Sequence, residues 1–159
     1  IMSLFLDAYL DQTKDSSKDI LTNFKRQLSH KSRCEETELG NLFADLMQKD
    51  SSFDIMLLGG GSFRKKTLGP ILDLASFKEA FPFNGAVYML EVTGAQFRRM
   101  CHYYLKQTVL TKGSAEFSNV SKGVKLVYDY IKDQLTECSF NGKQTQDDQI
   151  LKIGLQEFH

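Results

Sequence analysis

The sequence has few of the side chains from which metal sites and disulfide frameworks are built. Its 159 residues include only three cysteines and three histidines. The cysteines are far apart and form no C-x-x-C pair, and the histidines share no metal-ligand spacing with the cysteines or with one another. We therefore expect no metal site in this chain. Three cysteines cannot all pair with each other. The cysteines are Cys34, Cys101 and Cys138, and the histidines are His30, His102 and His159.

An excess of one charge is also absent, because 20 lysines and arginines balance 20 aspartates and glutamates. No overall field would draw the protein to a nucleic acid polymer or an anionic membrane, so any basic patch must be local. No apolar run reaches membrane-spanning length. The first ten residues carry Asp7 and no basic residue, which does not fit a signal peptide. We expect no partner of the nucleic acid polymer class and no membrane insertion by this segment.

Internal repeats and low-complexity linkers are missing too. A chain of this length is expected to form one domain over residues 1–159 and to bury roughly two-thirds of its unfolded surface. It begins with an isoleucine and stops on an apolar, strand-like run at Phe158 and His159. We interpret the chain as a piece of a longer protein.

The hydrophobic spacing predicts a mixed α/β domain. For a helix over about 38–49, Ser32 and Glu35 have capping-box spacing and Thr37 is a second candidate N-cap. Asp73 is a candidate N-cap for a short helix ending near 80, and Thr93 with Gln96 forms a capping box for a third helix. Cys101 falls on the apolar face of that third helix and is predicted to be a small core residue. Helical spacing extends over residues 4–10 and 20–28, although a strand is also possible in the second segment. Predicted strands lie at 53–58, 86–92, 124–131, 135–140 and 150–155, with a polar loop at 111–121.

One stretch stands out among these elements. Residues 55–64 read I-M-L-L-G-G-G-S-F-R, a buried strand followed by three glycines and Arg64. Consecutive glycines let a ligand approach main-chain N–H groups, and arginine suits phosphate or carboxylate. The spacing matches neither the P-loop nor the dinucleotide fingerprint. Two interpretations remain open, a binding corner and an ordinary glycine-rich turn with a solvated arginine.

Two phenylalanines lie on irregular backbone at 81–85, which reads F-P-F-N-G. Pro82 prevents a helix from continuing, and Asn-Gly favours a tight turn. Phe81 and Phe83 can serve as core side chains, which is the usual role of aromatics in loops, or as a stacking surface for a ligand.

Five ordered blocks together resemble the C-terminal domain of the 5'-nucleotidase family. They cover nearly all of the chain from Arg33 onward. The blocks are R-C-E-E-T-E-L-G-N-L-F-A-D at 33–45, G-G-G-S-F-R at 59–64, P-F through T-G-A-Q-F at 82–97, E-F-S-N-V-S-K-G at 116–123 and F-N-G-K at 140–143.

The resemblance implies an α+β domain with mixed sheets in a four-layer α/β/β/α arrangement. It also implies a division of labour, in which an N-terminal metallophosphoesterase domain of the same protein holds two divalent metal ions and performs the hydrolysis. The present domain would bind the nucleotide substrate and contain no catalytic residue or metal of its own, so that the isolated fragment is inactive. The family mostly works outside the cytoplasm, which implies an extracytoplasmic location.

Site residues follow from the same motifs. Arg33 and Arg64 would face the phosphate side of the substrate, and arginine can bind phosphate oxygens through two parallel hydrogen bonds. Phe83 would stack on one face of the base, and Phe158 lies where the second stacking phenylalanine is expected. The glycine corner at Gly59, Gly60 and Gly61 would complete the substrate site. An alternative role for Arg33 is a surface ion pair with a neighbouring acid.

The chain departs from the family pattern at three asparagine positions. Gly59, Glu38 and Glu157 stand where the family has asparagine, and the N-G-G-D-G stretch expected after Phe158 lies beyond the last residue. These departures support two further hypotheses. The chain could be a non-catalytic binding module that kept the fold, or part of a related hydrolase acting on cyclic nucleotides or nucleotide sugars.

Overall fold

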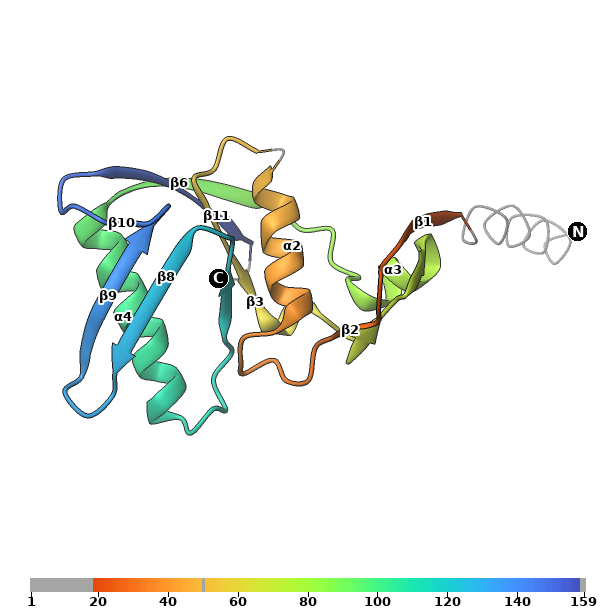
Figure 1. Cartoon of the computed structure of the whole chain (residues 1–159), viewed down its shortest axis with the longest axis horizontal. Coiled ribbons are helices and arrows are strands. Elements are labelled where there is room, and N and C mark those ends of the chain that lie inside the picture. The colour runs from red at the N-terminus through yellow and green to blue at the C-terminus, as the bar shows by residue number, and fades with distance from the viewer. Residues whose placement is uncertain (1–18, 50, 158–159) are drawn as a thin grey trace, which may run out of the picture.

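The computed structural model describes residues 19–49 and 51–157 (Figure 1). The helix predicted at 4–10 and the predicted stacking residue Phe158 lie outside these residues. Three α-helices occur in the described part of the chain, α2 (Glu38–Lys49), α3 (Leu74–Ala80) and α4 (Gly94–Leu110). The strands are β1 (Ile20–Asn23), β2 (Leu28–Ser29), β3 (Ile55–Gly59), β4 (Thr67–Leu68), β5 (Ile71–Asp73), β6 (Val87–Thr93), β7 (Ser118–Val120), β8 (Val124–Asp129), β9 (Gln134–Phe140), β10 (Lys143–Gln144) and β11 (Ile150–Gln156).

A four-stranded sheet with the order β6-β11-β3-β7 forms the centre of the molecule. Strand β11 runs parallel to β3 and antiparallel to β6, and β7 is antiparallel to β3. Every residue of β3 is buried. A strand that is covered on both faces reads as a continuous apolar run, which explains the sequence I-M-L-L.

Alternate side chains of β3 point into two separate cores, because successive residues of a strand face opposite sides of a sheet. Met56 and Leu58 pack with Leu39 and Phe43 of α2. Ile55 and Leu57 pack on the other face with residues of α4, β9 and β11, including Phe97, Cys101 and Cys138. Helix α2 therefore covers one face of the central sheet (Figure 1).

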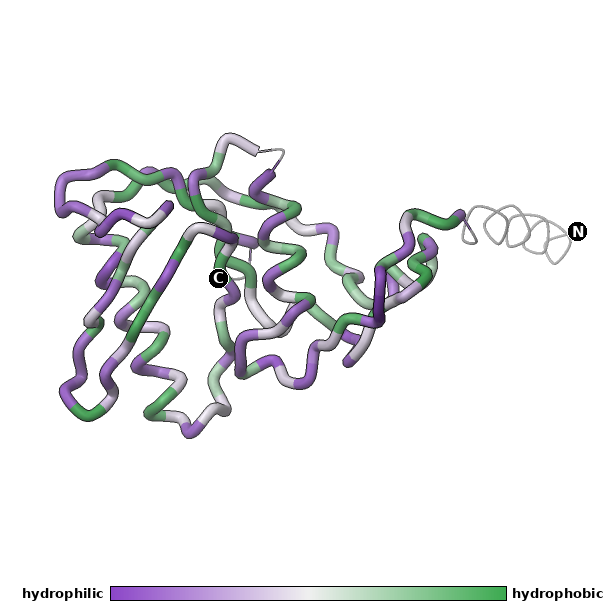
Figure 2. The backbone as a smooth tube through the Cα atoms, viewed as in Figure 1, coloured by the Kyte–Doolittle hydropathy of each residue, from purple (hydrophilic) through white to green (hydrophobic). Residues whose placement is uncertain are grey.

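The opposite face is covered by α4 and by a three-stranded antiparallel sheet with the order β10-β9-β8. Figure 2 shows hydrophobic residues gathered along the central strands, with hydrophilic residues in most of the connecting loops. The predicted core role of Cys101 is confirmed, because only 2% of this residue is exposed.

The predicted helix starts are confirmed at Thr37, Asp73 and Thr93. The capping-box prediction for Ser32 and Glu35 is wrong, because the hydroxyl of Ser32 accepts from the N–H of Cys34 at 3.1 Å and α2 begins only at Glu38. The hydroxyl of Thr37 accepts a hydrogen bond from the N–H of Gly40 at 3.1 Å, at the start of α2. Asp73 accepts from the N–H of Ser76 at the start of α3. Thr93 and Gln96 form the complete capping box of α4, with the two reciprocal hydrogen bonds that such a box requires.

One open alternative is decided and one segment differs from the prediction. Residues 20–28 contain strands and no helix, because β1 pairs with β5 and β2 pairs with β4 in two small antiparallel sheets. These strands and α3 lie together to one side of the central sheet (Figure 1). The predicted loop at 111–121 contains β7, which pairs with β3 through Val120 and Leu57. The strands β1, β2 and β7 all depend on pairing partners that are distant in the sequence, and local spacing does not reveal such partners.

Candidate functional site

The glycine corner lies at the end of β3, where the chain passes into a short 3₁₀ turn over Gly60–Ser62. The N–H of Gly60 donates to the carbonyl of Phe117 at 2.8 Å, and the N–H of Phe117 donates to the carbonyl of Arg33 at 2.9 Å. A Cβ atom on Gly60 would collide with the carbonyl oxygen of Arg33. Glycine is therefore required for a close backbone approach, which brings two distant segments to the end of β3.

Arg33 and Gly61 converge on one carboxylate. The guanidinium of Arg33 donates to Oε2 of Glu116 at 2.7 Å, and the N–H of Gly61 donates to Oε1 of the same residue at 2.8 Å. The side chains of Arg33 and Glu116 are 57% and 30% exposed. The surface ion pair that the sequence left open for Arg33 is present, and it lies at the corner itself.

Arg64 contacts Phe83 instead. Its guanidinium carbon lies 4.9 Å from the centre of the Phe83 ring, which is a cation–π arrangement. The N–H of Arg64 donates to the carbonyl of Ala80 at 2.9 Å. This bond ties the end of the corner to the loop that carries Phe83.

The two loop phenylalanines have different roles. Phe81 packs against the rings of Phe43 and Phe63, at 5.3 and 5.6 Å between ring centres, and so belongs to the core. Phe83 is only partly buried and lines a cavity. The core interpretation therefore holds for Phe81, and stacking of Phe83 on a ligand stays a prediction.

That cavity has a volume of about 300 Å³ and gathers four of the residues predicted from the sequence. Arg33, Gly61, Arg64 and Phe83 line it, together with Ser62, Glu116 and Gln156. Gly59 and Gly60 are buried beneath the corner and do not line the cavity. Phe158 is not among the described residues, so its predicted position stays a prediction.

Sequence reasoning gave no role to Ser62, Glu116 or Gln156. Ser62 donates to the side-chain oxygen of Gln156 at 2.5 Å, and both residues are buried. Glu116 belongs to the E-F block at 116–123 that supports the family resemblance, which is the signal that could have found it. Two guanidinium groups and one carboxylate give the cavity one net positive charge.

At two of the family's asparagine positions, this chain has a glutamate that forms hydrogen bonds with other residues of the chain. Glu38 accepts hydrogen bonds from Arg26 and from Ser29, which lower the pKa of its carboxyl to about 2. Glu157 accepts from the N–H of Ala86 at 3.3 Å, next to the loop of Phe83. Glu38 thus joins the start of α2 to the β1–β2 segment and takes no part in lining the cavity.

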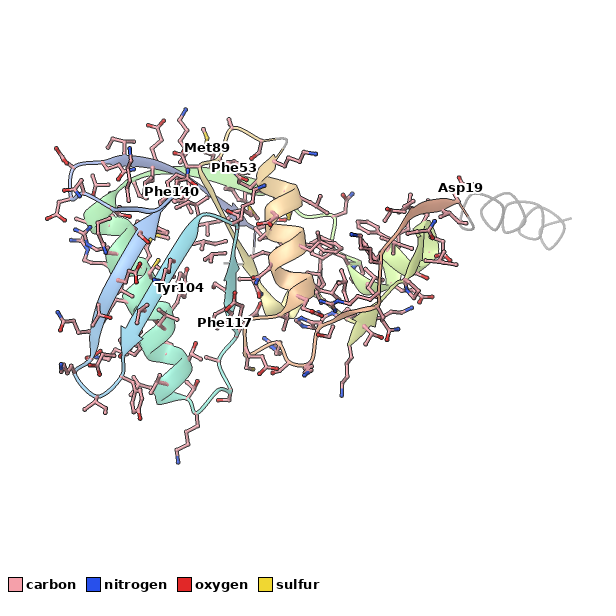
Figure 3. The ribbon with its side chains drawn as sticks, in the orientation of Figure 1. Asp19, Phe53, Met89, Tyr104, Phe117 and Phe140 are labelled. Carbon is pink, nitrogen blue, oxygen red and sulfur yellow. The ribbon has the colours of Figure 1, made fainter. Side chains whose placement is uncertain are left out.

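A second cavity of about 370 Å³ lies between α4, β7 and β8. Tyr104 from α4 and Phe117 from the loop before β7 line it (Figure 3). Half of its other residues are aliphatic, among them Leu57, Val124 and Leu126. This lining suits an apolar molecule and offers nothing comparable to the paired guanidinium groups of the first cavity.

Metal-binding and membrane-spanning features were sought in the described residues. Across residues 19–49 and 51–157, no group of three or more histidine, cysteine, aspartate or glutamate side chains is arranged to hold a metal ion. None of the helices in this part of the chain combines the length and hydrophobicity that crossing a bilayer requires.

Comparison with known proteins gives one family match. The model of the 5'-nucleotidase C-terminal domain matches residues 13–154. No curated protein matches the sequence.

Several solved structures share the fold. A 5'-nucleotidase precursor from Thermus thermophilus has a TM-score of 0.73 and 17% identity over 96% of this chain and 32% of its own. An NAD nucleotidase from Haemophilus influenzae has a TM-score of 0.77 and 12% identity over 98% of this chain and 31% of its own. The sulfate thiohydrolase SoxB of Thermus thermophilus has a TM-score of 0.73 and 14% identity over 97% of this chain and 30% of its own.

These identities show a common fold and no more. The α+β class with its four-layer arrangement, expected from the motifs, is confirmed. The chain spans about a third of the length of these solved relatives.

Proposed function

Because this chain belongs to the 5'-nucleotidase C-terminal domain family, we propose that it is the substrate-binding domain of a metal-dependent phosphoester hydrolase acting on nucleotides. The observation that carries the proposal is the cavity in which Arg33, Arg64 and Phe83 meet. In this proposal residues 1–159 form one domain of a longer protein, whose N-terminal metallophosphoesterase domain contains the catalytic residues.

The cavity offers the two kinds of contact that a nucleotide requires. Guanidinium groups bind phosphate oxygens through charge-assisted hydrogen bonds, and the N–H of Gly61 adds a main-chain donor. An aromatic ring stacks on any base, because every base has a π-face. Arg64 lies over one face of the Phe83 ring, so a base stacking on that face would displace its guanidinium and leave it free to bind the phosphate.

Hydrolysis itself requires groups from outside this chain. By resemblance, two divalent metal ions in the N-terminal domain would supply Lewis-acid catalysis and activate the attacking water. The residues of this chain would bind and orient the nucleotide relative to those metals. By the same resemblance we propose an extracytoplasmic location, which cell fractionation can test.

Replacing Phe83 tests the proposal directly. We expect Phe83→Ala to weaken binding of adenosine 5'-monophosphate by about tenfold, because stacking on one base contributes ~1–3 kcal/mol. The measurement is calorimetric titration of the 159-residue chain. Tyr130→Ala is the matched control, since it removes an aromatic ring that is 66% exposed and lies at the β8–β9 turn, away from the cavity. Equal affinity of Phe83→Ala and the unmodified chain would remove the proposed stacking site.

A non-catalytic binding module is the second candidate function. It is favoured by Gly59, which lacks the family's asparagine side chain, and by the engagement of Arg33 and Arg64 with neighbouring side chains of the chain. The two candidates differ in one measurable property. A module that has lost its ligand binds no nucleotide from a panel of monophosphates, cyclic monophosphates and nucleotide sugars, whereas the substrate-binding domain binds at least one class.

A further inference from the structure

We propose that Glu116 is a specificity-determining residue, whose carboxylate occupies the anion position of the cavity and disfavours doubly charged phosphate monoesters relative to singly charged phosphate diesters. The inference deepens the proposed function and rests on it for the identity of the ligand. It assigns a role to a residue that the sequence motifs left without one.

The geometry shows that Glu116 already uses the donors that a phosphate group would need. Its two carboxylate oxygens accept from the Arg33 guanidinium at 2.7 Å and from the Gly61 N–H at 2.8 Å. Main-chain N–H groups in a glycine-rich turn and an adjacent arginine are a common setting for anions. In this chain, the carboxylate of Glu116 occupies part of that anion site.

The backbone holds Glu116 in place. Its neighbour Phe117 donates to the carbonyl of Arg33 and accepts from the N–H of Gly60, so this segment is bonded on both sides. The carboxylate also lies close against the corner, because a Cβ atom on Gly61 would come within 2.6 Å of it. Rotation of the side chain can free the donors, but the charge stays near the cavity.

The effect of this charge depends on the ligand. Arg33, Arg64 and Glu116 together leave the cavity with one net positive charge, which one negative charge on a diester neutralises. A dianionic monoester brings a second negative charge next to the Glu116 carboxylate, and like charges placed close together in a binding site are costly. Glu116 therefore reduces affinity for monoesters more than for diesters.

Neutralising Glu116 is a clean test. Glu116→Gln keeps the length of the side chain and an oxygen that accepts from Gly61. It removes the charge and replaces the oxygen that accepts from Arg33 by an NH2 group. The Arg33 side chain is 57% exposed and the Glu116 side chain 30%, so solvent screens the ion pair and its loss has a small effect on stability. The probes are methyl phosphate, a dianion at pH 8 because its second pKa is about 6, and dimethyl phosphate, a monoanion. Binding is followed through the amide NMR signal of Gly61.

We expect Glu116→Gln to strengthen methyl phosphate binding by at least about tenfold and dimethyl phosphate binding by no more than about threefold. Glu137→Gln is the matched control, because Glu137 pairs with Lys125 on the β8–β9 hairpin and its replacement makes the same change in net charge outside the cavity. Adding Arg33→Ala to Glu116→Gln should abolish the gain.

Equal effects on the two probes, or no change with either, would overturn the inference. If Glu116→Gln does not fold, Glu116→Ser removes the same charge and decides the question by the same comparison. Adenosine 5'-monophosphate is titrated into the same variants. If it binds no tighter than methyl phosphate, the nucleotide proposal falls, while the role of Glu116 is still decided by the monoester and diester probes.

Discussion

Asp133, at the turn between β8 and β9, shows how one surface carboxylate can join two elements. It accepts hydrogen bonds from the Lys106 ammonium and from the Tyr128 hydroxyl, the latter at 2.7 Å, and pairs with His102 at 2.9 Å. Lys106 and His102 belong to α4, so this cluster fastens the hairpin to the helix. The bonds from Lys106 and Tyr128 lower the pKa of Asp133 to about 2.

A depressed pKa gives this cluster a defined pH dependence. The ionised form of Asp133 is favoured in the folded state, so its stabilising effect is complete above the ordinary aspartate pKa of about 3.9 and disappears as the pH falls to about 2. We expect Asp133→Asn to lower the unfolding temperature at pH 7 and to make no difference near pH 2. Thermal unfolding followed by circular dichroism across this range provides the measurement.

Asparagine is a suitable replacement because Asp133 has a φ of +51°, a conformation that asparagine tolerates. A difference in unfolding temperature that stayed constant from pH 7 to pH 2 would contradict this account of Asp133.

Individual residues could be predicted from the sequence where a motif fixed both the residue type and its position. Arg33, Gly61, Arg64 and Phe83 line one cavity, and their binding to a nucleotide stays a prediction. The E-F block marks Glu116, but its contact with the corner depends on the hydrogen bonds of Phe117 to Gly60 and Arg33, which the motif does not show. Spacing carries no information on contacts between residues so far apart in the chain.

Helix α4 packs in the same core as side chains of the central sheet and of β9. Its capping box satisfies the free N–H groups of the first turn, with Thr93 N–H to Gln96 at 2.7 Å and Gln96 N–H to Thr93 at 3.2 Å. We expect Thr93→Ala to lower the free energy of unfolding by about 1 kcal/mol, measured by urea denaturation.

Thr108→Ala is the control for that measurement. The hydroxyl of Thr108 bonds only to the carbonyl of Tyr104 within the same helix, and alanine is the better helix former. A loss from Thr108→Ala as large as that from Thr93→Ala would show that the capping box is not the source of the effect.

Elements with a strong local signal were predicted closely. The helix expected at about 38–49 is α2 (Glu38–Lys49), because its cap and its apolar stripe act within a dozen residues. The strands β4, β5, β7 and β10 were missed, and a strand at β1 and β2 was only left open as an alternative. The missed strands are two or three residues long and exist only through pairing with β2, β1, β3 and β9. Their stability comes from tertiary contacts, so propensity alone cannot place them.

The chain spans about a third of the length of its solved relatives, so the last prediction compares it with a longer protein. We expect the isolated chain to release no phosphate from nucleotides with Mn²⁺ or Zn²⁺ present, and the protein that includes the proposed N-terminal domain to do so. In that longer protein, Arg64→Ala should raise KM about tenfold or more, because one charge-assisted hydrogen bond contributes ~1.5–3 kcal/mol. A phosphate-release assay on both proteins makes the comparison, and turnover by the isolated chain would contradict the proposed division of labour.

Strand β3 has a consequence for how the cavity meets its ligand. Leu57 packs into one core and Leu58 into the other. The glycine corner that follows is therefore held in position by packing on both faces of the sheet. The donors at the end of this strand are thus preorganised by the interior of the protein, and little ordering entropy remains to be lost when a ligand arrives.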